Sequence, residues 1–300
     1  MVTEAFSPAF WELVSKEACL STISGGYTFT EGIMWHSREK YLVWTDIIGD
    51  KIMKWRPGIG TSVLKSPAGH PDGTFIDREG RLVVAGWGNR TVWRLEHDGS
   101  TTVLASHYQG KMLNTPNDIV VKSDGMIYFT DPSNGVRHPG HQDGDIQKYL
   151  DFDGIYRLDP DTKALTLLAT GEFNPNGLCF SPDESLLYIN LIKARCIHVY
   201  DVLPDGTIGN GRLFAELIHA DLGGPDGMKC DTLGNVWCTG PGGVWAMDSK
   251  GNPLGRIRMP EHTANFTFGG DDLKTMFFAT RKTIYATTLN VAGMALPYQK

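Results

Sequence analysis

The amino-acid sequence predicts an all-β fold: one six-bladed β-propeller with four-stranded antiparallel blades. One hairpin pattern occurs six times, and its copies follow one another at a nearly regular spacing. The composition, with 35 Gly, 8 Trp, 10 Tyr and 13 Phe in 300 residues, suits many short strands joined by tight turns. We expect residues 1–300 to form this single domain.

The repeated pattern is a polar residue, a short apolar run, a turn and a second apolar run. This order is typical of a β-hairpin. The six copies begin at Glu31, Asp72, Asn117, Asn176, Asp226 and Asn265. Most of the intervals between these starts are close to the roughly 40–45 residues of a four-stranded propeller blade. Further strand-like runs between the hairpins complete four strands per repeat.

The chain before Glu31 is expected to supply a strand that closes the ring against the last blade. A long helix has a place only within residues 6–18. The alternative, an all-β sandwich array, fits the regular spacing of the repeats less well.

The interval from Asn117 to Asn176 is too long for one blade and predicts an insertion at about residues 132–152. This stretch is rich in Gly, His and charge and lacks apolar alternation. Loops longer than about 12–15 residues are usually functional or disordered. We expect the insertion to lie over the tunnel face of the propeller as a lid or wall; a solvated surface excursion is the alternative.

Charge and composition exclude several classes of protein. The net charge of −6 argues against a nucleic-acid partner, and no run of 18 apolar residues predicts a membrane span. The N-terminus lacks the pattern of a signal peptide. Five cysteines without a C-x-x-C motif predict reduced thiols in a cytoplasmic protein, and they fit small core residues better than nucleophiles or ligands.

The first residue of each repeat is predicted to face the central tunnel, where the six positions form a ring. Buried polar groups need partners, so either water or a cation must fill the ring. The carboxylates of Glu31 and Asp226 and the amide oxygens of Asn117 and Asn176 make a hard, oxygen-only set that suits Ca²⁺, Mg²⁺ or Mn²⁺. The alternative is that the Asn-Gly and Asp-Gly pairs at 72–73, 176–177 and 226–227 are simply tight turns.

The sequence closely resembles the gluconolactonase branch of the SMP-30/gluconolactonase/LRE family. The resemblance covers roughly residues 20–290 and rests on TEGIMWH (30–36), NTPNDIVVKSDGMIYFTDP (114–132), PNGLCFSPDESLLYIN (175–190) and GGPDGMKCDTLGNVWCTGPGGVWAMD (223–248), with GNR (88–90) and FGGDD (268–272) in addition. It implies a six-bladed propeller with one divalent cation in the axial tunnel, and hydrolysis of a sugar lactone such as gluconolactone.

The resemblance also implies roles for individual residues. Glu31, Asn176 and Asp226 would be metal ligands, Asn117 a ligand or near neighbour of the ion, and Asp118 would lie close behind it. Calcium is the first expectation for the ion, with Mg²⁺, Mn²⁺, Zn²⁺ and Fe²⁺ as alternatives; the absence of His from the ring weakens the case for zinc.

Three positions depart from the family's pattern on the substrate side. Trp87 stands where many gluconolactonase-like members have a His, HPDG (70–73) replaces the Asn of the second repeat, and Thr115 stands where the animal branch has an Arg. These departures leave open which lactone is used.

Hydrolysis of a lactone needs a polarised carbonyl and an activated water, and a bound cation supplies both. Asp226 is the candidate general base, with a role in ligation alone as the alternative. His36, His70 and His262 are alternative proton carriers near the expected tunnel mouth. The candidates for substrate contacts are Asn117, Asp118, His70 and, in the insertion, Arg137, His138 and His141.

Two other functions compete with the lactonase prediction. One is a phosphotriesterase or fluorophosphatase-like hydrolase, in which the aspartate acts as nucleophile. The other is a non-catalytic propeller that binds a ligand, against which the acidic ring residues argue. No G-x-S-x-G, G-x-G-x-x-G or P-loop motif supports a serine hydrolase, dehydrogenase or kinase. The expected partner is a small lactone, and the expected assembly is a monomer or homodimer.

Overall fold

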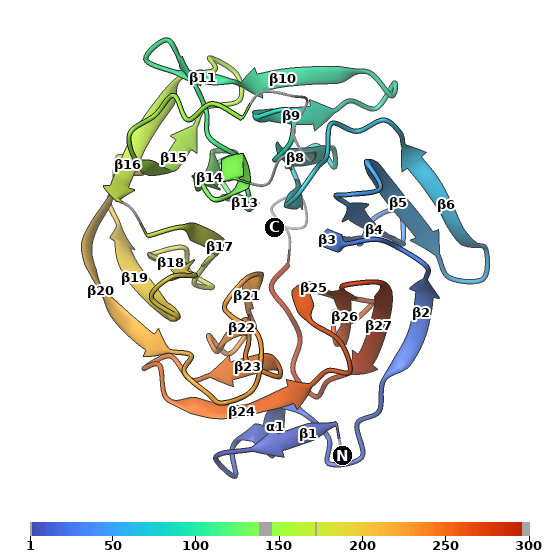
Figure 1. Ribbon diagram of the computed structural model, residues 1–300. Helices are drawn as coiled ribbons and strands as arrows, with labels where there is room; N and C mark the ends of the chain where they lie inside the picture. The colour runs from blue at the N-terminus through green and yellow to red at the C-terminus, as the bar shows by residue number, and fades with distance from the viewer. Residues whose placement is uncertain (1, 138–145, 172, 296–300) are drawn as a thin grey trace.

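The computed structural model describes residues 2–137, 146–171 and 173–295, and for Arg137 the backbone alone. Within these residues, six antiparallel sheets surround a central axis (Figure 1). In each sheet, the strand that begins the hairpin repeat lies beside the axis, and the edge strand farthest from it lies at the rim. The predicted all-β six-bladed propeller is therefore confirmed.

Four blades are formed by consecutive strands. They are β3 (Thr30–His36), β4 (Tyr41–Asp46), β5 (Lys51–Arg56) and β6 (Gly60–Lys65); β7 (Thr74–Ile76), β8 (Leu82–Gly86), β9 (Thr91–Leu95) and β10 (Thr101–Ala105); β13 (Ile119–Val121), β14 (Ile127–Asp131), β15 (Asp153–Leu158) and β16 (Leu165–Gly171); and β17 (Pro175–Phe180), β18 (Leu186–Leu191), β19 (Cys196–Val202) and β20 (Ile208–Glu216). A small ribbon of β11 (His107–Tyr108) and β12 (Lys111–Met112) follows the second blade.

The last two blades take strands from the N-terminus. The fifth consists of β21 (Met228–Cys230), β22 (Val236–Gly240), β23 (Gly243–Met247), β24 (Pro253–Arg258) and the N-terminal β1 (Thr3–Ala5). The sixth consists of β25 (Thr263–Gly269), β26 (Thr275–Thr280), β27 (Thr283–Thr288) and β2 (Ser21–Gly25). The pairing of β2 with β27 closes the ring as predicted, whereas the addition of β1 to the fifth blade was not expected. The helix α1 (Phe10–Leu13) between them is short.

Hydrophobic contacts between neighbouring blades make up the core. The middle strands are buried along their whole length, as in β8 (LVVAG) and β14 (IYFTD), because each blade is covered on both faces by its neighbours. Outer strands such as β6 (GTSVLK) are largely exposed, which matches their polar composition. Stacking of blades therefore explains why the inner runs of each repeat are almost continuously apolar.

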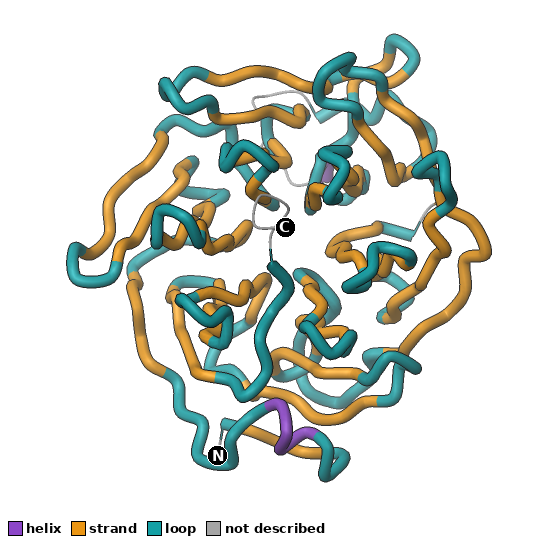
Figure 2. Tube along the Cα trace, turned by 180° about the vertical axis from the view of Figure 1, so that it is seen from behind, coloured by secondary structure: helices purple, strands orange, loops and turns teal. Residues whose placement is uncertain are grey.

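After β27 the chain turns inward and runs toward the axis, as both views of the ring show (Figures 1 and 2). The amide of Gly293 donates to the carbonyl of Leu273 at 2.9 Å, and the amide of Thr232 donates to the carbonyl of Ala292 at 3.0 Å. This C-terminal segment, residues 289–295, thus joins the fifth and sixth blades. The described part of the chain contains no helix that is long and apolar enough to cross a membrane, and all five cysteines, each within the described ranges, are free thiols.

Candidate metal and catalytic centre

The six residues that head the repeats meet at the axis, where the inner strands begin. The amide of Asn117 donates to Asp72 Oδ2 at 2.7 Å, and the amide of Asn265 donates to Glu31 Oε2 at 2.9 Å. The carboxyl of Asp226 forms side-chain hydrogen bonds with Asn176 and Glu31. The predicted ring is therefore present. Asp226 is its partly exposed member, whereas the other five are between 3% and 7% exposed.

Glycines that follow ring residues allow the neighbouring blades to approach. A Cβ atom on Gly177 would lie 2.0 Å from the carbonyl oxygen of Asp226, and one on Gly32 would lie 2.1 Å from that of Asp72. Asn176 and Gly177 both belong to β17, at an irregularity in its pairing with β18 that re-aims side chains. The alternative interpretation of Asn176-Gly177 as a tight turn is therefore wrong.

Side chains at the ends of second strands hold the ring residues of the next blade by their backbone carbonyls. Thr45 Oγ1 donates to Asp72 O at 3.0 Å and Thr130 Oγ1 to Asn176 O at 2.8 Å. The amide of Asn190 donates to Asp226 O in the same way. The sequence interpretation missed these positioning residues. Their recurrence at equivalent places in three of the repeats, at the end of the second apolar run, would have revealed them.

The ring carries more negative charge than its surroundings can compensate. Burial is the main cause that raises the pKa of Glu31, to about 7, and the nearby Asp118 carboxylate raises it further. Burial also raises the pKa values of Asp72 and Asp226 well above their usual range, and repulsion from Glu31 adds to both shifts. Without a cation, the hydrogen bond between the carboxyls of Asp226 and Glu31 requires a proton to be shared between them.

Lys229 is a further residue at this centre that the sequence interpretation missed. It lies in β21, three residues after Asp226. Its ammonium donates to Asn265 Oδ1 at 3.4 Å. Its charge lowers the pKa values of Glu31 and Asp118, although burial outweighs this effect in both. Lys229 therefore compensates part of the charge of the ring.

Asp118 lies behind the ring rather than at its surface. Its side chain is 4% exposed, and Oδ1 accepts the amide of Ile119 at 2.9 Å. Burial raises the pKa of this carboxyl as well. In this position the Asp118 carboxylate influences the charge of the ring, and its predicted contact with the substrate stays a prediction.

The three predicted proton carriers occupy different places. His36 lies at the far end of β3 from Glu31, where its Nε2 contacts Gly80 O at 3.1 Å, so it is remote from the ring. His70 precedes the ring residue Asp72, but its Nδ1 contacts Ile47 O at 2.8 Å, a backbone contact that fixes the imidazole. His262 directly precedes β25, and burial lowers its pKa.

The insertion connects β14 to β15 on the side of the propeller where the ring lies. Arg90, from the GNR stretch, anchors it: Nη1 donates to the carbonyl of Gln147 at 2.8 Å. Gly135, in the 3₁₀ turn η1 (Gly135–Arg137), fits against two positions that depart from the family's pattern, because a Cβ there would lie 2.3 Å from Trp87 Nε1 and 2.6 Å from Thr115 Oγ1.

Of the predicted substrate contacts in the insertion, Arg137 ends η1. His138 and His141 lie outside the described residues. The insertion thus lies against Trp87 and Thr115, two of the three positions at which the sequence departs from the family's pattern.

The sequence model of a protein family, described as the SMP-30/Gluconolactonase/LRE-like region, matches residues 29–282 of the chain. The chain belongs to this family. A gluconolactonase of Zymomonas mobilis subsp. mobilis is 31% identical over 273 residues, which cover 84% of this chain and 76% of the relative. A pentonolactonase of Haloferax volcanii is 28% identical over 260 residues, or 83% of this chain and 80% of the relative.

Among solved structures, a gluconolactonase of Xanthomonas campestris superimposes with a TM-score of 0.87. It is 32% identical, and the match covers 96% of this chain and 95% of the other. The family that the sequence motifs suggested is confirmed, and the chain spans most of the length of its relatives.

Proposed function

We propose that this protein, as a single propeller domain, hydrolyses a sugar lactone to the free acid with the help of one divalent cation in the ring. As a member of a family whose relatives include gluconolactonases and a pentonolactonase, it is a hydrolase of cyclic carboxylic esters. One observation carries the proposal beyond the family: at the axis, the carboxyl of Asp226 is hydrogen-bonded to the side chains of Asn176 and Glu31, and Asn117 is hydrogen-bonded to the neighbouring ring residue Asp72.

The residues of the ring fit a hard divalent cation. The described residues contain no group of three or more His, Cys, Asp and Glu side chains arranged for a metal. The proposed ion would be held by a mixed set of donors. Carboxylate and amide oxygens are such a set, and calcium accepts both. A cation would also relieve the repulsion that raises the pKa values of Glu31 and Asp226. We infer that Glu31, Asn117, Asn176 and Asp226 hold the ion.

The bound cation would polarise the lactone carbonyl and make the attacking water more acidic. Asp226 is the ring carboxyl with access to solvent, so it can both contact the ion and face the substrate. In the proposed reaction its carboxylate takes a proton from the water as the water adds to the carbonyl carbon. The ester C–O bond then breaks, and the same proton passes to the leaving oxygen.

A panel of aldonolactones, assayed by acid release, tests this function. We expect turnover of at least one lactone, loss of turnover after treatment with EDTA, and recovery when Ca²⁺ or Mn²⁺ is added back. A phosphotriester in the same panel examines the competing hydrolase function. Full activity in demonstrably metal-free protein would contradict the proposed cation, and inertness toward every lactone in metal-loaded protein would contradict the proposed reaction.

Affinity for the cation is expected to rise with pH and then level off. The carboxyl of Glu31, with a pKa of about 7, holds a proton below that pH, and the proton must leave before a cation binds. Each pH unit below 7 should therefore weaken binding at least about tenfold. Calorimetric titrations with Ca²⁺ between pH 5.5 and 8.5 measure this slope. Glu31→Gln should show a shallower slope, and a dissociation constant that is constant from pH 6 to 8 would speak against the prediction.

Shortening the insertion is expected to change the choice of lactone and to leave the cation site intact. A short Gly-Ser linker in place of residues 138–145 keeps the anchors of Arg90 and Gln147. Relative kcat/KM values among lactones should shift by about tenfold, the usual effect of altered pocket contacts. Stoichiometry and affinity for Ca²⁺, measured by calorimetry, should match the unshortened protein. Loss of the ion would place part of the metal site within the insertion.

A further inference from the structure

A second site for a ligand lies at the end of the tunnel remote from the ring. A cavity of about 100 Å³ is lined there by later residues of the same inner strands, including Cys179 of β17 and Lys229 and Cys230 of β21. Met294, from the C-terminal segment, lines it from another side. The cavity is distinct from the ring, because Cys179 and Cys230 follow Asn176 and Asp226 by three and four residues along extended strands, or about 10 Å.

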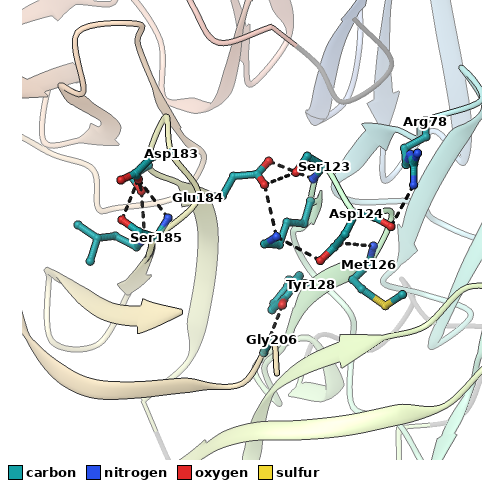
Figure 3. Close-up of polar contacts among 12 residues, drawn as sticks. Arg78, Ser123, Asp124, Met126, Tyr128, Asp183, Glu184, Ser185 and Gly206 are labelled. Atoms are coloured by element: carbon teal, nitrogen blue, oxygen red, sulfur yellow. Dashed lines mark hydrogen bonds and ion pairs between the residues drawn. The ribbon is translucent and has the colours of Figure 1, made fainter. Parts of the chain in front are cut away.

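Contacts between blades hold the rim of this cavity. Glu184, a lining residue, accepts the amide of Ser123 at 3.0 Å and lies 3.5 Å from Lys122 Nζ. Figure 3 shows Glu184 directed toward Ser123 across the two neighbouring hairpins. The cavity therefore lies among fixed elements and is preformed.

Two thiols face this cavity as a pair. The Sγ atoms of Cys179 and Cys230 are 3.7 Å apart, the side chains are 5% and 4% exposed, and both residues line the cavity. They come from different blades, so the tertiary structure alone brings them together. Met294, the third sulfur-bearing residue, packs against the same hydrophobic cluster.

We propose that Cys179, Cys230 and Met294 bind a soft monovalent metal ion, Cu(I). Thiolate and thioether sulfur are the ligands that select Cu(I) over hard cations. With metal–thiolate bonds of about 2.3 Å, two sulfur atoms 3.7 Å apart subtend about 110° at an ion between them. Such an angle leaves room for a third donor, and the proposal assigns this place to Met294, which lines the same cavity. Structural zinc sites use four ligands, so this set of three does not fit one.

The charge of the surroundings agrees with this assignment. Two thiolates and one Cu(I) ion carry one net negative charge, and Lys229 lines the same cavity. The contact with Cys179 and burial raise the pKa of the Cys230 thiol well above its usual range.

A disulfide between the two cysteines is the competing use of this pair, and the experiment below distinguishes the two uses. The sulfur atoms would have to approach from 3.7 Å to about 2.05 Å. The strands that carry them are already in contact, since a Cβ on Gly177 of β17 would lie 2.0 Å from Asp226 O, just before β21. An ion that bridges the present separation needs no such movement.

Anaerobic titration of the full chain with Cu(I), in competition with bicinchoninate, tests the proposal. We expect one tightly bound Cu(I) per chain, and Cys179→Ala or Cys230→Ala should weaken binding at least about 100-fold. Met294→Leu, close in volume, should weaken it about tenfold. Cys238→Ala is the matched control, because this thiol is buried in the same cluster and does not line the cavity; its affinity should equal that of the unmodified protein. Circular dichroism establishes that each variant is folded.

The proposal fails if Cu(I) binds equally well to the folded Cys179→Ala and Met294→Leu variants, or if Cys238→Ala removes it. It also fails if the unmodified protein binds no Cu(I). If hydrogen peroxide then consumes two more thiols in the unmodified protein than in Cys179→Ala, the pair is a disulfide-forming one. None of these outcomes depends on lactone hydrolysis or on the ring cation.

Discussion

Asp226→Asn is expected to lower kcat for lactone hydrolysis by about 10²–10⁴-fold at saturating metal, the usual contribution of a general base. Asn keeps an oxygen of similar reach, so the ion can remain bound with weaker affinity. It cannot accept a proton from water at neutral pH, so the attacking water loses its base. Initial rates over a range of metal and lactone concentrations measure the effect, and KM for the lactone should change little.

Asp72→Asn is the matched control for this prediction. It removes a carboxylate from the same ring, but Asp72 is 5% exposed and its Oδ2 is occupied by the amide of Asn117. At saturating metal its kcat should stay within about tenfold of the unmodified protein, below the contribution of a general base. If added metal restores full turnover to Asp226→Asn, then Asp226 is a ligand only and another group accepts the proton.

Glu31→Gln is expected to weaken divalent-cation binding by about two orders of magnitude, because ligand charge is the main determinant of calcium affinity in oxygen sites. The amide can still accept the hydrogen bond of Asn265, so the shape of the ring is kept. Calorimetry with Ca²⁺ and Mn²⁺ measures the change. Excess metal should restore turnover in this variant, in contrast to Asp226→Asn.

The exposed carboxylate Glu17 provides the control for this substitution. Glu17→Gln removes the same charge from the molecule at a distance from the ring and should leave metal affinity unchanged. An affinity for Ca²⁺ in Glu31→Gln equal to that of the unmodified protein would remove Glu31 from the proposed ligand set.

The fold could be predicted from the sequence because the propeller repeats one local pattern. Each polar-headed hairpin carries its own turn and apolar alternation, and its regular recurrence implied blades of four strands. The ring of Glu31, Asn117, Asn176 and Asp226 followed from the same repeat, since equivalent positions in a closed ring face one axis. The closing strand β2 followed from the chain that remained before Glu31.

Other features could not be predicted because they depend on contacts between segments far apart in the chain. The pairing of β1 with β24 joins residues 3–5 to residues 255–257. His36 was expected near the tunnel mouth as an alternative proton carrier, and the direction of β3 places it at the end of that strand remote from the ring. Lys229 lies within an ordinary strand sequence, and the tertiary structure alone brings its ammonium to Asn265.

The sequence by itself determined the six-fold repetition, the closure of the ring and the polar residues at its centre, because these depend on the local order of polar and apolar residues and on the periodicity of strands. The tertiary structure decided the electrostatics of the ring and which side chains from different blades contact one another. The raised pKa of Glu31, the exposure of Asp226 and the pairing of Cys179 with Cys230 arise where blades meet. Burial and the distances between charges exist only once the ring has closed, and no local pattern encodes them.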